Sequence, residues 1–494
     1  MQDLIRLAGV VAENTPNTLP VVDNTDSTSL EGRFYQLLRQ KEAHTDEDAC
    51  AMLYGNSEVT SSYRMLKSRV RKKLLNNLFF VEISERHVKI SKKLLLECHA
   101  TLLQANKLLA LQEYVLAEKL VDQVISMAQK AELNDVLANA YEFKQQRDLL
   151  TQDRGRFEKN LKLMQRYHLL DAKEKEALGL FNQLKFEISV NISNMRKQGA
   201  AYFKSLMKLR ELWDQTGSSS IYNKYYLINI GYQEIIGNYD QILENIAEAE
   251  ALLADKKLNP FWFNHHFTNY IKVFAYLRLR KIEEGLRAAK TSLDLYKEGT
   301  VNWFAFLENY VALVLHGKYY KTAVELCNMA ISKGKDGFEA PKMQETWLLI
   351  ERYVRLVSHK AGAKLSHTLM SDEAEPSIIS RDKDGYNLPL LIVDYLEQLP
   401  HLGAEELEQY VGRFEKYIVK YLKGHAATRA RLILKLLIVS MKEDARNLEK
   451  KGARHYRKLL ATPPTRDPLA EVEIIPYEHL WEIAQERALL RITK

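Results

Sequence analysis

Four stretches of this chain carry the same helical stripe of small and bulky residues, and this repetition limits the possible fold more than any other feature. The stripes are Tyr114-Ala117-Val121-Val124, Tyr239-Ile242-Ile246-Ala249, Ile282-Gly285-Ala289-Ser292 and Tyr320-Ala323-Cys327-Ala330. Steps of three and four residues place each set on one face of a helix. A small residue one turn into the helix lets the preceding helix lie close, so each stripe predicts a pair of packed helices.

The spacing of the stripes supports a repeat. Tyr239 and Ile282 are 43 residues apart, Ile282 and Tyr320 are 38 apart, and the 125 residues from Tyr114 to Tyr239 would hold three units of about 42 residues. The stretches resemble the second helix of tetratricopeptide (TPR) repeats, in which an aromatic residue, an Ala, a bulky residue and a second Ala follow one another. The resemblance implies an α-solenoid of TPR-like helical hairpins. The alternative is that any amphipathic helix carries Ala at such steps, but four related occurrences favour the array.

The low content of helix breakers extends this prediction to the whole chain. Only 20 Gly and 11 Pro occur in 494 residues, which favours long helices over many short strands. We therefore predict an all-α fold. Its expected order is a loose leader (1–28), a small basic helical domain (29–93), TPR-like repeats (94–360), an exposed loop (361–388), basic C-terminal helices (389–461) and a tail (462–494) whose terminal helix docks on the array.

The sequence contains no motif that indicates catalysis or metal binding. It has no GxGxxG after a strand, no GxxxxGK[ST] and no GxSxG. Cys50, Cys98 and Cys327 lie too far apart in sequence for a CxxC metal site, and the adjacent pairs Cys98–His99 and His265–His266 would point about 100° apart on a helix. We expect no enzymatic activity, no cofactor and no metal. No basic leader or membrane-length apolar run is present, so we expect a cytoplasmic protein with no membrane partner.

Positive charge is concentrated in two regions. Residues 59–93 hold ten Lys or Arg against two Asp or Glu, and residues 415–461 hold thirteen against four. In the first region, an apolar stripe predicts a helix with its back buried: Tyr63, Leu66, Val70, Leu74 and Leu78. Six basic residues cover the two flanks of this helix, and they are our candidate contacts to nucleic-acid phosphates: Arg64, Lys67, Arg69, Arg71, Lys72 and Lys73. The alternative is that these side chains are simply solvated or paired with acidic neighbours.

The surroundings of this helix suggest a DNA-binding module. A helix is predicted before it, and a turn at Gly55–Asn56 separates the two. After it, Phe79, Val81 and Ile83 alternate with polar residues, as do Val88 and Ile90, and these two runs predict a small β-hairpin. The segment YRMLKSRVRKKL, chiefly Ser68, Arg69, Arg71 and Leu74, resembles the recognition helix of the winged-helix module in bacterial antibiotic-regulatory transcription activators. That family places TPR-like helices after the winged helix. The resemblance implies a helix-turn-helix with a wing over residues 45–90.

An aromatic stretch inside the predicted array, FWFNHHFTNYIKVFAYLRL (261–279), could line a groove that binds a peptide. We interpret its aromatic residues as core and retain Asn264 and Asn269 as candidate groove residues. Two functions remain open at this point. The first is a non-enzymatic scaffold that binds a protein or peptide on the repeat surface. The second is a DNA-binding transcriptional regulator that contacts nucleic acid through residues 59–93.

Overall fold

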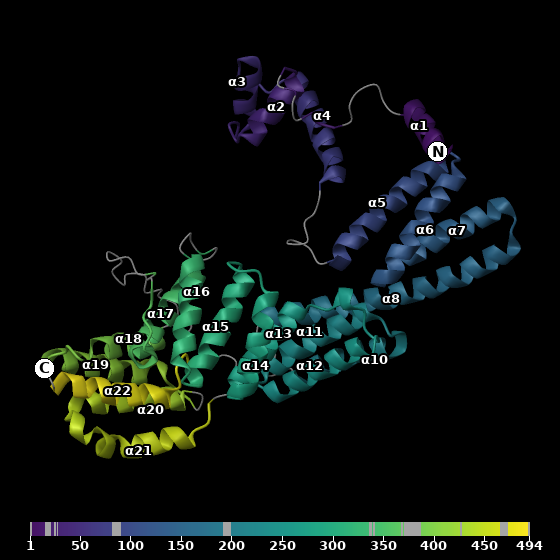
Figure 1. The fold of residues 1–494 in the computed structure, drawn as a ribbon. Helices are drawn as coiled ribbons and strands as arrows, with labels where there is room; N and C mark the ends of the chain where they lie inside the picture. The colour runs from purple at the N-terminus through teal and green to yellow at the C-terminus, as the bar shows by residue number, and fades with distance from the viewer. Residues whose placement is uncertain are drawn as a thin grey trace. The chain divides into compact units, whose positions relative to one another are not determined.

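The computed structural model describes residues 2–14, 21–23, 26, 28–81, 90–190, 199–334, 338, 341–366, 369, 387–424, 427–464 and 473–492 (Figure 1). Over these ranges all regular secondary structure is helical and no strand occurs, which confirms the all-α prediction. The chain divides into two compact units, residues 1–176 and 177–494. The boundary falls within a long helix, α8 (Arg154–Val190).

The first unit begins with four short helices and continues with long ones. They are α1 (Gln2–Asn14), α2 (Leu30–Arg39), α3 (Asp46–Tyr54), α4 (Ser61–Asn77), the 3₁₀ turn η1 (Leu78–Phe80), α5 (Ile90–Ala110), α6 (Tyr114–Ala131), α7 (Asn134–Thr151) and the start of α8. The segment predicted as a loose leader thus contains a helix, α1. Its Arg6 forms an ion pair with Glu113, before α6.

Local capping determines where α3 begins and ends and where α4 begins. The Thr45 side chain accepts the Asp48 N–H, and the Asp48 side chain accepts the Thr45 N–H, which forms a capping box at the start of α3. Gly55 ends α3 in the left-handed conformation, with φ of 78°. Thr60 caps α4 by accepting the Tyr63 N–H. Helices α2, α3 and α4 share a small apolar core of Phe34, Ala49, Cys50, Leu53, Tyr63, Leu66 and Val70.

The predicted wing is not supported at the positions that can be checked. Phe79 lies in the 3₁₀ turn η1 and Ile90 begins helix α5, while Ile83 and Val88 lie outside the described residues. Phe79 and Val81 are 68% and 58% exposed, so their alternation does not create the half-buried face that a strand needs.

The second unit is a succession of antiparallel helices (Figure 1). They are α10 (Gly199–Thr216), α11 (Ser219–Ile235), α12 (Tyr239–Ala254), η2 (Pro260–Trp262), α13 (His265–Arg278), α14 (Ile282–Ser292), η3 (Leu293–Leu295), α15 (Val301–His316), α16 (Tyr320–Gly334), α17 (Pro341–Ala361), α18 (Asn387–Gln398), α19 (Ala404–Tyr421), α20 (Thr428–Lys442), η4 (Ala445–Asn447), α21 (Leu448–Ala461) and α22 (Tyr477–Ile492). From α10 to α18 each helix packs on the next, and α15 also contacts both α13 and α17.

Each of the four stripes begins at the first residue of a helix, namely α6, α12, α14 and α16. The small residues of the stripes are buried, and their size allows close packing. A Cβ added to Gly285 of α14 would lie 2.8 Å from Cδ2 of Leu313 in α15. The stripes therefore mark helix starts as well as contact faces.

The same three-residue turn precedes all four of these helices. The residue two before the helix has a positive φ: Gln112 (62°), Gly237 (72°), Arg280 (54°) and Lys318 (61°). In each turn this residue donates its N–H to the carbonyl three residues earlier, and the next residue donates to the carbonyl five residues earlier, at 2.8–3.2 Å. These are the two hydrogen bonds of a Schellman turn. The same backbone conformation therefore joins the two helices of each of the four hairpins, although the turn sequences differ.

Gly237→Ala should lower the free energy of unfolding by about 1 kcal/mol, because a Cβ is unfavourable at positive φ. Gly412→Ala is the matched control with the opposite sign. Gly412 lies inside α19 with nothing within 4 Å of its added Cβ, so Ala should stabilise by about 0.5–1 kcal/mol. Urea unfolding followed by tryptophan fluorescence measures both. Equal effects of the two variants would contradict this account of the turn.

The C-terminal helices α18–α22 complete the core of the second unit. Leu480 and Trp481 of α22 are 1% and 2% exposed within this core. A Cβ added to Gly452 of α21 would lie 2.7 Å from the Trp481 ring, so a glycine is needed for this close approach. Together, α20, α21 and α22 pack on one another.

Candidate functional site

The solvent-facing side of α4 is the candidate nucleic-acid interface. Tyr63, Leu66 and Val70 are each 1% exposed and face α2 and α3. Tyr63 also donates its hydroxyl to the Asp46 carboxylate at 2.8 Å. The helix is therefore held by the first three residues of its apolar stripe. The prediction was wrong for Leu78, which lies in η1 and is 63% exposed, and Leu74 is only half-buried, because the core formed with α2 and α3 does not extend to the end of α4.

Three of the six basic residues are used to hold the helices of this domain together. Lys67 forms an ion pair with Asp46 at the start of α3. Arg69 and Lys73 both contact Glu31 of α2, with nitrogen–oxygen distances of 3.4 Å and 2.6 Å. Because these cations already neutralise neighbouring carboxylates, they are poorer candidates for phosphate contacts than the sequence indicated.

The other three, Arg64, Arg71 and Lys72, are exposed and form no ion pair within the part of the chain that is described. Arg64 and Arg71 are seven residues apart, which is about 10.5 Å along one side of a helix. Lys72 lies beside Arg71 toward the neighbouring flank. These three cations form the free basic face of α4, which we define by these residues.

The segment that carries this face has only a small net positive charge. Residues 28–81 contain nine Lys or Arg and six Asp or Glu, a net charge of +3. Large apolar side chains are also exposed in this segment, at 54–76%: Met65 near the start of α4, Leu75 near its end, and Leu78, Phe79 and Phe80 in η1.

The two candidate groove residues have different environments. The Asn264 side chain accepts the Phe267 N–H and caps α13, so its amide oxygen has a structural role. Asn269 is half-buried and its side chain makes no hydrogen bond within the described residues.

Beside Asn269 lies a polar row that sequence reasoning missed. Tyr270 of α13 is hydrogen-bonded to Asn309 of α15, and two carboxylates, Glu308 of α15 and Glu234 of α11, act on Tyr270 electrostatically. Burial raises the pKa of Glu308 to about 7. Burial also raises the pKa of Glu234, although the positive charge of Arg278 opposes this. Neither carboxylate has an ion pair or side-chain hydrogen bond within the described ranges. No local pattern distinguishes these two Glu from solvated ones, so they could not be identified from the sequence.

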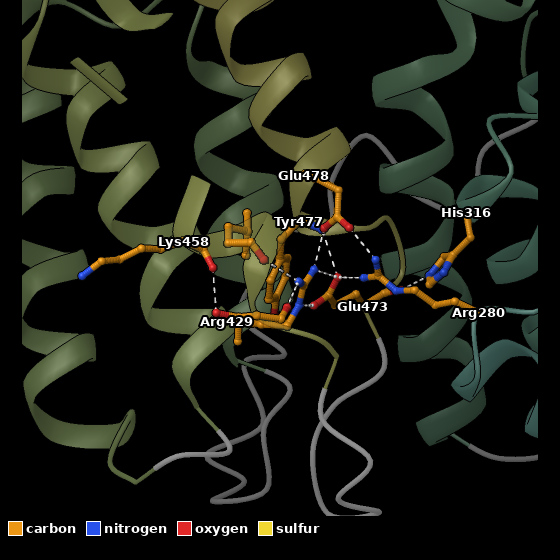
Figure 2. A network of polar contacts seen from close by, with 9 residues as sticks. Arg280, His316, Arg429, Lys458, Glu473, Tyr477 and Glu478 are labelled. Atoms are coloured by element: carbon orange, nitrogen blue, oxygen red, sulfur yellow. Dashed lines mark hydrogen bonds and ion pairs between the residues drawn. The ribbon is translucent and has the colours of Figure 1, made fainter. Parts of the chain in front are cut away.

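A second polar cluster joins the C-terminal segment to the helices before it (Figure 2). Arg429 of α20 binds both oxygens of Glu473, at 2.6 Å and 3.0 Å, and also contacts Glu478. Arg280, from the turn before α14, contacts the same two carboxylates. Arg429 also donates to the carbonyls of Leu459 and Thr462, at 3.0 Å and 2.6 Å. Figure 2 shows the two guanidinium groups on either side of the carboxylates.

The electrostatics of this cluster identify it as a structural clamp. The Arg429 and Glu473 side chains are 6% and 9% exposed. Burial raises the pKa of Glu478, but hydrogen bonding to Arg280 and the charges of both Arg residues outweigh it and lower the pKa to about 2. Burial lowers the pKa of His316, which contacts the Glu473 carbonyl, to about 4. Every charge in the cluster is paired, so we find no open position there for a substrate.

The remaining features offer little for catalysis. No group of three or more His, Cys, Asp or Glu residues that could hold a metal occurs among the described residues. All three cysteines are buried, and burial raises the pKa of Cys98 to about 11 and of Cys327 to about 12, so these thiols are not activated. A recess of about 750 Å³ near α19 is lined by apolar residues such as Leu407, Val411 and Met441 and by four charged ones, Glu408, Glu415, Lys442 and Arg491. Among the described residues we also find no helix with the length and apolar character needed to cross a bilayer.

Comparison of the chain with protein-family models, with curated proteins and with solved structures found no match. The fold and the sites therefore define the protein only as an all-helical chain with a basic helix in its first unit and a polar row in its second.

Proposed function

We propose that this chain is a non-enzymatic protein–protein interaction scaffold whose second unit is an α-solenoid of TPR-like hairpins. The observation that carries the proposal is the repeated unit itself: a Schellman turn, then a helix that opens on a bulky residue and buries small ones. The contacts of α15 with both α13 and α17 support it, because alternate helices of stacked hairpins meet in this way. Such an array presents a row of helices to a partner.

The scaffold is tested by capture from the lysate of its source cells. The immobilised full chain should retain one protein in stoichiometric amount, and binding should survive the substitution of Arg64, Arg71 and Lys72 by Ala. A partner that is lost with these substitutions would move the binding site to the first unit. The absence of any stoichiometric partner would count against a scaffold.

A DNA-binding regulator is the second candidate, favoured by the free basic face of α4. A helix with its back buried and with three cations on its open side that pair with no described residue can meet phosphates along a groove. The cations that pair with Glu31 and Asp46 would then orient this helix.

The variant Arg64→Ala/Arg71→Ala/Lys72→Ala should weaken binding of the full chain to duplex DNA by about tenfold or more at low salt. The slope of log K against log salt should fall by about 3, because each lost phosphate contact removes about 0.9. Fluorescence anisotropy with a labelled duplex measures both quantities.

The matched control is Lys416→Ala/Lys420→Ala/Lys423→Ala, which removes the same charge from exposed positions around the end of α19. It should leave DNA binding nearly unchanged. An equal loss in both triple variants would indicate attraction by net charge alone and would exclude α4 as the specific interface. If the wild-type chain does not bind DNA, the regulator hypothesis is wrong.

A further inference from the structure

The solvent-facing side of α21 carries a row of exposed cations. Its members are Lys450, Arg454, Arg457 and Lys458. Because successive residues of a helix are rotated by about 100°, these four side chains fall within an arc of about 100°. The opposite side of the helix is buried and consists of Leu448, Gly452 and Leu459. We call the four cations the α21 basic face.

The fold does not use these charges. None of the four forms an ion pair with a described residue, whereas the neighbouring Lys451 pairs with Glu443 at 3.4 Å. Figure 2 shows the Lys458 side chain extending away from the C-terminal clamp. The only acidic residue of α21, Glu449, lies on the side away from Lys458. Like charges four residues apart also weaken a helix, so the row has a cost to stability that the fold does not offset.

The same unit shows which surface complements cations arranged in a row. Three glutamates follow one another at steps of four along one side of α22: Glu478, Glu482 and Glu486. Each pairs with a cation near the end of α13, α15 or α17, and these cations are Arg280, Lys318 and Lys360. The second and third pairs have nitrogen–oxygen distances of 2.7 Å and 2.6 Å. This chain therefore already holds an acidic helix by a row of cations.

We propose that the α21 basic face binds an acidic helix of a protein partner, with carboxylates at steps of four residues. Lys450, Arg454 and Lys458 rise by about 6 Å at each step, and glutamates four residues apart on a partner helix have the same rise. Two aligned helices can therefore pair charge by charge, as neighbouring helices of coiled coils do. This inference rests on the proposed scaffold function and adds the chemistry of the partner's surface.

Other anionic surfaces fit the α21 basic face less well. A helix that lies on a lipid surface inserts large apolar side chains, and Leu460 is the one large apolar residue of α21 that is exposed. Single-stranded nucleic acid is held by stacking on aromatic rings, and the basic face contains none. Duplex DNA offers phosphates without these requirements, so it is included in the test.

The test measures binding of the full chain to a labelled, alanine-based helical peptide of about 20 residues with a glutamate at every fourth position. Fluorescence anisotropy at low salt gives the affinity. The variant Lys450→Gln/Arg454→Gln/Lys458→Gln should bind this peptide at least tenfold more weakly than the wild type. A peptide of the same composition, with its glutamates spread around the helix, should also bind the wild type several-fold more weakly.

The matched control is Lys208→Gln/Lys257→Gln/Lys333→Gln. It removes the same charge from the second unit, at side chains that are 42–65% exposed and paired with carboxylates at 2.7–3.2 Å. This control should bind the peptide as the wild type does. The proposal is overturned by an equal loss in both triple variants, by equal binding of the two peptides, or by no binding to the wild type. Tighter binding of a duplex DNA that is lost with the α21 substitutions would overturn it in favour of nucleic acid.

The captured partner separates this inference from the scaffold proposal. If the wild type and the Lys450→Gln/Arg454→Gln/Lys458→Gln variant retain the same partner equally well, the chain is a scaffold but the α21 basic face is not its binding site. If no partner is retained and the peptide still binds through α21, the acidic-helix site stands and the scaffold proposal fails.

Discussion

Arg429→Ala should lower the free energy of unfolding of the second unit by about 3–5 kcal/mol. The substitution leaves the buried Glu473 carboxylate with only part of its positive partner and removes hydrogen bonds to the Leu459 and Thr462 carbonyls. Breaking a buried ion cluster by removing one partner has a cost of this size, because the remaining charge stays desolvated. All five tryptophans lie in the second unit, so urea unfolding followed by tryptophan fluorescence reports this unit alone.

Lys442→Ala is the control for this prediction. Lys442 pairs with Glu415 at 3.1 Å, but both side chains are 55% exposed, so the loss should stay below about 1 kcal/mol. If Arg429→Ala destabilises no more than Lys442→Ala, the cluster does not act as a clamp.

Glu308→Gln should have the opposite effect and stabilise the second unit by about 2 kcal/mol at pH 8. The glutamine has nearly the same shape as the glutamate but carries no charge that needs hydration. A pKa near 7 instead of the ordinary 4.5 corresponds to about 3 kcal/mol for complete ionisation, and partial exposure reduces this figure. Tryptophan-detected urea unfolding measures the difference.

The pH dependence of this difference gives a sharper check. Because the folded protein holds a proton on Glu308 more tightly than the unfolded chain does, the penalty is fully present above pH 7. It should decrease as the pH falls from 7 to 4.5 and vanish below pH 4.5, where both states are protonated. The advantage of the Gln variant should therefore disappear over this range. An advantage that stays constant with pH would show that the carboxylate is not the cause.

The local features of this fold could be predicted from the sequence. The small-residue stripes at steps of three and four identified four helices. The structure adds that each stripe begins at the first residue of its helix, such as Tyr239 and Tyr320. The buried side of α4 could also be predicted, because Tyr63, Leu66 and Val70 repeat with the helical period. These features depend on residues within a turn or two of one another, and backbone geometry alone relates such residues.

The predicted hairpin after α4 was not found where it can be checked. Two short alternations suggested strands at Phe79 and Ile90, but these residues belong to η1 and α5. Short apolar runs do not distinguish strand from helix, because period two and period 3.6 differ little over three or four positions.

The sequence by itself determined which segments become helices and which side of each is buried. Only the tertiary structure decided what each charge does. Glu31 pairs with Lys73, and Glu473 pairs with the buried Arg429. Arg71 and Glu308 have no oppositely charged partner among the described residues. The physical reason is distance along the chain. Helix periodicity links near neighbours, whereas the partners of these charges are about forty residues away and meet them only when the helices pack.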